Sequence, residues 1–242
     1  MAKAPKAGHS KTRLSSALSP EAAASLSAAF LRDATENIRL ASREASIAGF
    51  VAYAPAGQEE LFADHVAAGT SLVLADGSPP MPPGVHRLGR SLLHAFQSLL
   101  SAGFGAACMV NSDSPNLPTS LLVEGARALL APGERVVLGP AEDGGYYLLG
   151  LRTPHPHLFQ NIPWSTPGVA EATRNRAQAL GLELIELEPW YDVDDSASLQ
   201  RLIQELSNGA ASRSLTPYRA PATAACLQRF GLSATMAART AQ

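Results

Sequence analysis

The stretch GAACMVNSD, residues 105–113, decides the class of fold. Its apolar run at 106–110 has no polar alternation, which is typical of a strand buried on both faces, and the run leads to the carboxylate of Asp113. Helical patterns flank it at 88–103 and 117–131. Strands that alternate with helices predict an α/β domain with a mostly parallel sheet.

The same alternation continues in both directions along the chain. It is lost after residue 208, so we expect one domain over residues 1–208 and a tail over 209–242. The tail either forms a short helix around 221–231 or is mobile. Further helices are expected at 20–45, 57–68, 166–181 and 194–209, and further strands at 46–55, 70–76, 134–140, 146–151 and 182–188.

The composition is that of an ordinary globular protein, with 242 residues, 46% hydrophobic residues and a net charge of -2. It does not support a nucleic-acid or membrane-surface binder. No apolar run approaches the length of a membrane span, and the basic start lacks the apolar core of a secretory signal, so a cytoplasmic protein is expected. Two cysteines, Cys108 and Cys226, do not make a disulfide framework. The sequence does not indicate the oligomeric state.

The first loop, MAKAPKAGHSKTRL, carries cations around a glycine. Gly8 permits close approach of backbone N–H groups to an anion, and Lys3, Lys6, Lys11 and Arg13 would neutralise phosphate charge. The alternative is a solvated basic arm. No Walker sequence is present.

This loop has no strand before it, although ligand loops of α/β sheets follow strands. Either residues 1–4 are the stub of that strand, or the chain start lies a few residues downstream of the natural one. In the second case, the missing residues are expected to form an apolar central strand of about five residues.

Asp113 is the first candidate metal ligand. A carboxylate after a buried strand points into the crevice where ligands bind, and it suits Mg²⁺ or Mn²⁺ held together with a phosphate. The alternative is a helix or turn cap. We favour the metal role because Asn116 and Thr119 can serve those local functions.

The segment WYDVDD, residues 190–195, places three carboxylates within four positions. They repel one another unless a cation or hydrogen-bond donors compensate. Asp192 or Asp194 is the candidate second metal ligand, and Asp195 could cap the last helix.

The turn in VLGPAEDGGYYLLGL, residues 137–151, holds Glu142, Asp143, Gly144 and Gly145 between two strand-like runs. An Asp-Gly pair alone suffices for a β-hairpin, so a structural turn is one interpretation. Further along, Trp164 either stacks on a sugar ring or a base, or fills the core.

Together these motifs resemble the bacterial GT-A-type transferases known as DUF2064, or as selenium- or arsenosugar-associated glycosyltransferases. These are related to nucleotide-diphospho-sugar transferases. The resemblance covers roughly residues 1–208. Its motifs are K-x-P-x-x-G-x-x-K-T-R-L, S-D-x-P-x-L-P, G-P-A-x-D-G-G-Y-Y-L-L-G-L, W-S-T and D-V-D-D-x-x-x-L.

The resemblance implies a Rossmann-like GT-A fold of three α/β/α layers. It implies that Lys11 and Arg13 hold the nucleotide phosphates and that Asp113 binds Mg²⁺ or Mn²⁺. The turn would face the donor sugar or the acceptor, with Asp143 as a base or hydroxyl-binding group. The expected substrate-binding residues are Glu142, Gly144, Gly145, Tyr146 and Trp164.

One departure affects substrate identity, because Arg87 and Arg90 replace acidic residues common in the family. The expected function is metal-dependent glycosyl transfer from a nucleotide-diphospho-sugar. One alternative is a nucleotidyltransferase that releases pyrophosphate. Another is a non-catalytic nucleotide- or sugar-binding protein.

Overall fold

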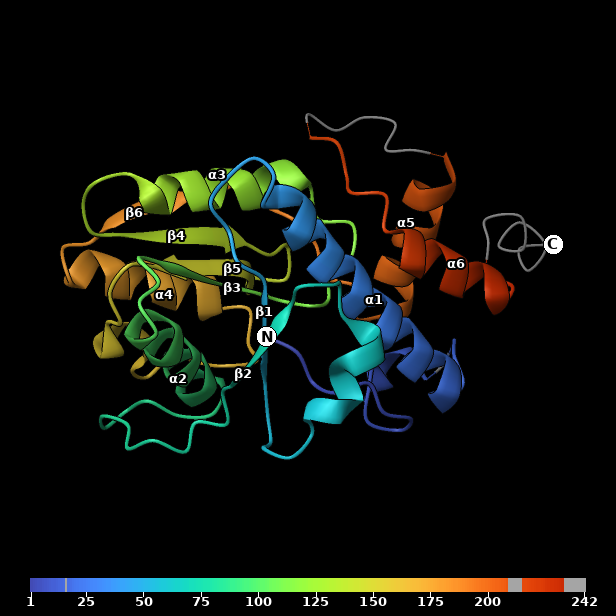
Figure 1. Ribbon diagram of the computed structural model, residues 1–242, viewed down its shortest axis with the longest axis horizontal. Helices are drawn as coiled ribbons and strands as arrows, with labels where there is room; N and C mark the ends of the chain where they lie inside the picture. Colours follow the sequence, from blue (N-terminus) through green and yellow to red (C-terminus); the bar gives the residue numbers. More distant parts are fainter. Residues whose placement is uncertain (16, 209–214, 233–242) are drawn as a thin grey trace.

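The computed structural model describes residues 1–15, 17–208 and 215–232 (Figure 1). Its strands fall into two sheets, one of β1 and β2 and one with the order β3–β5–β4–β6. The strands are β1 Phe50–Tyr53, β2 Ser71–Leu74, β3 Ala107–Val110, β4 Arg135–Pro140, β5 Tyr146–Leu151 and β6 Glu183–Glu186. The α-helices are α1 Pro20–Ala41, α2 Leu88–Ser101, α3 Thr119–Leu130, α4 Val169–Ala179, α5 Ser196–Asn208 and α6 Pro221–Arg229. Short 3-10 helices are η1 Thr12–Leu14, η2 Glu59–His65 and η3 Pro156–Phe159.

Strand β5 runs antiparallel to both of its neighbours, β3 and β4, whereas β4 and β6 are parallel. Strands β3, β4 and β6 therefore share one direction, and β1 and β2 are also parallel to each other. Strand β5 reverses because a short turn joins it to β4, and such a connection permits only an antiparallel pair. The predicted α/β class with a mostly parallel strand direction is confirmed, with β5 as the exception.

Helices cover both faces of the four-stranded sheet. Figure 1 shows α3 along one face and α4 with α2 along the other. Successive residues of β4 point to opposite faces: Val137 packs in the core with α1, α3 and α5, and Val136 and Leu138 pack in the core with α2 and α4. This is the three-layer arrangement that the resemblance implies.

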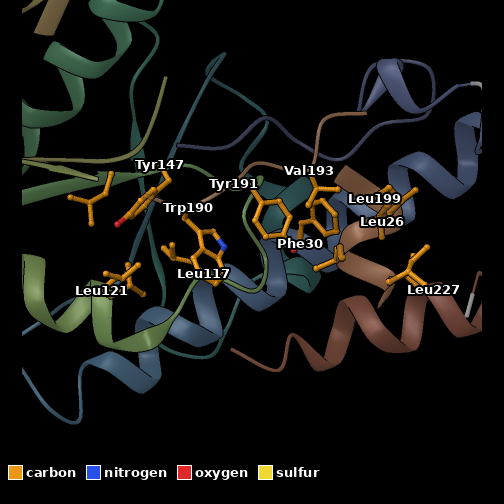
Figure 2. Packing of buried hydrophobic residues seen from close by; sticks show 14 of the residues in the cluster. Leu26, Phe30, Leu117, Leu121, Tyr147, Trp190, Tyr191, Val193, Leu199 and Leu227 are labelled. Atoms are coloured by element: carbon orange, nitrogen blue, oxygen red, sulfur yellow. The ribbon is translucent and has the colours of Figure 1, made fainter. Parts of the chain in front are cut away.

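Trp190 and Tyr191 lie at the centre of the first core (Figure 2). Their rings stack with centroids 5.7 Å apart, and both side chains are buried. They lie between Leu121 of α3 and Leu227 of α6, so they connect the sheet side of the core to the C-terminal helices. The acidic segment that follows them is thereby held in a fixed position.

Helix α1 begins as predicted. Pro20 occupies the first turn, and the Ser19 side chain accepts a hydrogen bond from the backbone N–H of Ala22. The short helix expected at 57–68 is present, but as the tighter 3-10 helix η2. No described helix is both long enough and apolar enough to cross a membrane.

Of the two possibilities for the tail, a short helix forms at α6. Asp33 of α1 fixes its start, because the carboxylate accepts the backbone N–H groups of Ala222 and Thr223 at 3.1 and 2.6 Å. Burial is the main cause of the raised pKa of Asp33. The remaining tail segments, 209–214 and 233–242, lie outside the described residues.

Candidate functional site

A cavity of about 480 Å³ lies where the first loop crosses the carboxyl ends of β1, β2 and β3. This is the edge at which ligands bind in open α/β sheets. Small residues that follow the strands form part of its lining, among them Ala54, Ala75 and Ser112. The polar side chains that line it include Lys3, His9, Ser10, Lys11, Thr12, Arg13, Asp113 and Asp194.

The first loop folds through its own turn before it reaches this cavity. The backbone N–H groups of His9 and Ser10 donate to the Lys6 carbonyl, and the Lys6 N–H donates to Ser10 Oγ. Gly8 has a φ of 75°, in the left-handed region that glycine adopts most easily. Lys11 also lies in this region, with a φ of 49°, immediately before η1. The turn therefore directs the Lys11 side chain inward.

The Lys11 ammonium is almost fully enclosed, with a side-chain exposure of 7%. Its Nζ lies 2.6 Å from Asp113 Oδ1 and 3.1 Å from Asp194 Oδ1, and it donates to the Val193 carbonyl at 2.8 Å. Arg13 differs: its side chain is 77% exposed, and it reaches Asp194 only at 4.0 Å. Lys11 is thus occupied by protein groups, whereas Arg13 can reorient towards a ligand.

Asp113 is a cavity carboxylate and not a helix cap. Helix α3 has Pro118 at its cap position, with no side-chain cap bond. The local roles expected of Asn116 and Thr119 are wrong, because both make distant contacts: Asn116 donates to Tyr191 Oη and Glu205, and Thr119 donates to Asn37. Asp195 does cap α5, since its Oδ1 accepts the Ser198 N–H at 2.8 Å.

Asp192 is separated from the Lys11 contacts and has its own donors. Its Oδ1 accepts hydrogen bonds from Asn111 Nδ2 and Ser114 Oγ, each at 2.7 Å. The pKa of Asp192 is raised to about 6, mainly by burial and to a lesser extent by the charges of Asp113 and Asp143, whereas these two hydrogen bonds lower it. Asn111 and Ser114 received no role in the sequence analysis. Their position directly after a buried strand was the signal that could have placed them at the site.

The oxygen atoms around the Lys11 ammonium fit a divalent ion that has further ligands. Oxygens of Asp113, Asp194 and Val193 converge on one point, which the Lys11 ammonium now occupies. Oxygen is the ligand that Mg²⁺ and Mn²⁺ prefer, and Mg²⁺ commonly takes one or two carboxylates plus phosphates and waters. Within the described residues, no three His, Cys, Asp or Glu side chains are grouped to hold a metal. An ion here would need phosphate or water ligands.

Structural contacts account for several residues of the Glu142–Gly145 turn. Gly145 N–H donates to Asp143 Oδ1 at 2.9 Å, and Arg201 of α5 holds Glu142 with two contacts of 2.6 and 3.0 Å. Gly144 has a φ of 90°, and a Cβ there would lie 2.1 Å from the Pro167 carbonyl oxygen. Gly144 thus allows the turn to pack against the segment before α4, and this turn does not line the 480 Å³ cavity.

Tyr146 and Trp164 both have a buried polar atom without a partner. Tyr146 Oη and Trp164 Nε1 are two of the four buried side-chain N or O atoms that lack a hydrogen bond in the described part of the chain. Trp164 is 6% exposed, and its indole packs against Gly89 of α2. The core-filling interpretation of Trp164 therefore accounts for its position, but not for its unsatisfied N–H.

The structure brings part of the predicted site together. Lys3, Lys11, Arg13, Asp113 and Asp194 line one cavity. The remaining predicted residues do not line it: Gly8, Glu142, Asp143, Gly144, Gly145, Tyr146, Trp164 and Asp192. The cations of the first loop thus meet Asp113 and Asp194. The Glu142–Gly145 turn and Trp164 lie elsewhere.

Comparison with known proteins gives one family match. Residues 25–166 match the model of a family described as "Uncharacterized protein conserved in bacteria (DUF2064)". The matched range contains Asp113, Asp143 and Trp164 and excludes the first loop. No curated protein matches the chain at a significant level.

Solved structures give a second, longer match. A protein from Desulfovibrio desulfuricans G20, described provisionally as a nucleotide-diphospho-sugar transferase, is 26% identical in sequence. It superposes with a TM-score of 0.77, over 95% of this chain and 92% of that one. The likeness therefore extends well beyond residues 25–166.

Proposed function

The chain belongs to the DUF2064 family, and we propose that it transfers a sugar from a nucleotide-diphospho-sugar donor. The observation that carries the proposal is the cavity of about 480 Å³ in which three loop cations face two carboxylates. Its volume lies in the usual range for small-ligand pockets, roughly 300–1,000 Å³. The similarity to the Desulfovibrio protein supports the same class of substrate.

The first loop would bind the diphosphate. Arg13 is mostly exposed, so its guanidinium can turn towards a phosphate and form a forked contact. Lys3 is exposed at the same cavity and would add a second charge. Lys11 would exchange one of its carboxylate partners for a phosphate oxygen. These cations would stabilise the leaving nucleotide diphosphate, which is the main catalytic demand of this transfer.

Mg²⁺ or Mn²⁺ would be held by Asp113 and Asp194 and would supply further neutralisation of the leaving group. Lys11 contacts both of these carboxylates. We therefore expect the divalent ion and the Lys11 ammonium to compete for the same oxygens. Asp192, with its pKa raised to about 6, would add negative charge beside them at neutral pH.

We assign binding of the acceptor to the Glu142–Gly145 turn, Tyr146 and Trp164. Asp143 is exposed and close enough for its charge to raise the pKa of Asp192, so it would accept a proton from the attacking hydroxyl. Tyr146 and Trp164 would donate their unsatisfied O–H and N–H groups to sugar hydroxyls after a local opening. Glu142, held by Arg201, and the glycines Gly144 and Gly145 would fix the position of Asp143.

The test compares Arg13→Ala with Lys6→Ala by calorimetric titration of nucleotide sugars. Charge-assisted contacts contribute about 1.5–3 kcal/mol each, so Arg13→Ala should weaken binding by about tenfold or more. Lys6 is an exposed cation of the same loop outside the cavity lining, and its loss should change the affinity little. Equal affinities for both variants and the unaltered protein would return the loop to the solvated-arm interpretation.

Product analysis then separates the three functions. Release of a nucleoside diphosphate from a nucleotide sugar supports the glycosyltransferase. Release of pyrophosphate from a nucleoside triphosphate identifies a nucleotidyltransferase. Binding that Arg13→Ala weakens, with neither product formed, identifies a non-catalytic binding protein.

A further inference from the structure

His9 lines the ligand cavity, and the proposed function gives it no role. It is exposed, and its ring makes no hydrogen bond or ion pair with any described residue. Three other histidines do contact a neighbouring side chain: His94 with Asp76, His155 with Glu134 and His157 with Gln160. His9 is thus a titratable group at the cavity that can bind a ligand without losing a contact within the protein.

The turn of the first loop fixes the position of His9. The N–H groups of His9 and Ser10 both donate to the Lys6 carbonyl, at 3.1 and 3.0 Å, and Gly8 precedes them with a φ of 75°. Ser10 is buried, and its Oγ accepts the Lys6 N–H at 2.9 Å. The backbone therefore holds His9 at the cavity, although its ring has no contact of its own.

The charges around His9 favour an anion as its partner. In the described part of the chain, the charged side chains of this lining come from three segments: Lys3, Lys11 and Arg13 of the first loop, Asp113 after β3 and Asp194 before α5. The lining residues from α1, from α2 and from the ends of β1 and β2 are alanine, serine or leucine. Lys11 lies within 3.1 Å of both carboxylates, so these acids are already paired. A phosphate bound among these groups would favour a protonated imidazole beside it.

We propose that His9, in its protonated form, is a ligand for the phosphates of the bound nucleotide, so that the affinity of the site rises as the pH falls from about 8 to about 5.5. This inference rests on the proposed function. An imidazolium has two N–H donors, and a charged donor binds a phosphate more strongly than a neutral one. His9 thus adds a charge that depends on pH to the permanent charges of Lys3 and Arg13.

A nucleotide-diphospho-sugar is the appropriate probe, because both of its phosphates are esterified. Its charge stays constant over this pH range, whereas a terminal phosphate takes up a proton near about pH 6. A change of its affinity with pH therefore comes from the protein. UDP-glucose and GDP-mannose, titrated by calorimetry at both ends of the range, offer a pyrimidine and a purine.

Two other groups near the site titrate in the same range. Burial lowers the pKa of the Met1 amine to about 6, and it raises the pKa of Asp192 to about 6. The charge of Asp113 acts on both of them. Because these groups are present in every variant, the contribution of His9 is the part of the pH dependence that His9→Asn loses.

The unaltered protein should bind the probe about tenfold more tightly than His9→Asn at about pH 5.5, and nearly equally at about pH 8. His9→Lys carries a permanent charge, so it should bind about tenfold more tightly than His9→Asn at about pH 8 as well. His86→Asn is the matched control, because His86 is exposed and lies outside the lining. This variant should behave as the unaltered protein.

The same pH dependence in His9→Asn and in the unaltered protein would overturn the proposal and leave the proposed function intact. Full affinity of His9→Phe at both pH values would also overturn it, since the ring would then stack on the base and not bind phosphate. If neither nucleotide sugar binds, the same variants are titrated with sulfate, whose charge is also constant over this range. Sulfate binding at low pH that His9→Asn abolishes would support the role of His9 and count against the proposed function. Equal sulfate binding in all variants would overturn both.

Discussion

The ammonium of Lys11 lies 2.6 Å from the Oδ1 of Asp113, and the same nitrogen contacts Asp194 at 3.1 Å. The first loop is thereby joined to the ends of β3 and of the segment before α5. Two carboxylates that would repel each other are instead neutralised by one cation of the chain. The proposed phosphate-binding lysine thus also supports the structure of the site.

The first prediction concerns Asp113→Asn. From the sequence, removal of this charge is expected to relieve repulsion with Asp192 and Asp194, but the ion pair with Lys11 reverses that expectation for the free protein. Because Asp113 is partly exposed, the loss of stability should be small, at most about 1 kcal/mol. Metal-dependent nucleotide-sugar binding should fall sharply, since an amide is a poorer ligand for a hard cation. Titration with and without Mn²⁺, beside thermal unfolding, measures both effects.

Asp195→Asn is the control for this variant, because Asp195 caps α5 and Asn caps about as well as Asp. Metal-dependent affinity that stays the same in Asp113→Asn would exclude Asp113 as a ligand.

The second prediction concerns competition at Lys11. Lys11→Met keeps an unbranched apolar side chain and removes the ammonium, which also lies 5.2 Å from the centre of the Phe30 ring. The oxygens of Asp113, Asp194 and Val193 would then be available, so Mn²⁺ alone should bind about tenfold more tightly, while the ion-free protein loses about 1 kcal/mol of stability. Lys3→Met removes an exposed charge that makes none of these contacts, and it should leave Mn²⁺ affinity nearly unchanged. Weaker Mn²⁺ binding in Lys11→Met would rule out competition.

The third prediction uses the pKa of Asp192, which is raised from 3.8 to about 6 by burial. The folded state then binds a proton more tightly than the unfolded state, so this group stabilises the fold below about pH 4 and loses that contribution as pH rises through about 6. Asp192→Asn keeps an oxygen for Asn111 and Ser114. It should therefore be close to the unaltered protein at about pH 4 and exceed its stability at about pH 7, by roughly 3 kcal/mol.

Denaturant unfolding over this pH range measures the difference. Asp195→Asn should show the opposite trend, because hydrogen bonds from Ser198 lower the pKa of Asp195. A pH-independent difference for Asp192→Asn would show that Asp192 does not titrate in this range.

The fourth prediction compares two glycines with positive φ. Gly144→Ala should destabilise the fold by more than about 3 kcal/mol, because its Cβ would collide with the backbone of Pro167 in addition to the backbone strain. Gly8→Ala meets no atom within 4 Å, so only the conformational term of about 1 kcal/mol applies. Similar losses for both variants, measured by denaturant unfolding, would contradict the packing argument at the turn.

Local signals in the sequence predicted the elements and several of their ends. The apolar run at 106–110, the helix that begins at residue 20 and the Asp195 cap each depend on residues close together in the chain. The family resemblance predicted that the first loop and Asp113 belong to one site. Residues of the loop and Asp113 do line one cavity.

Contacts between distant elements were not predictable from the sequence in the same way. The pairing of Lys11 with Asp113 depends on how the first loop crosses the ends of the strands. Asn116 and Thr119 bind Tyr191, Glu205 and Asn37 instead of capping locally, because packing brings those groups near. Gly144 indicated a turn, but its close approach to Pro167 required the position of α4.

The hydrogen bonds that Asp33 accepts from the start of α6 tie this nine-residue helix to α1. If the backbone were cut between α5 and α6, the two pieces would retain a charged acceptor on one side and two backbone donors on the other, with Leu227 as an apolar anchor. The shorter piece could then be supplied as a synthetic peptide carrying a dye. The fluorescence anisotropy of the peptide would rise when it binds the folded larger piece. The two pieces would then act as a split-protein reporter that depends on Asp33.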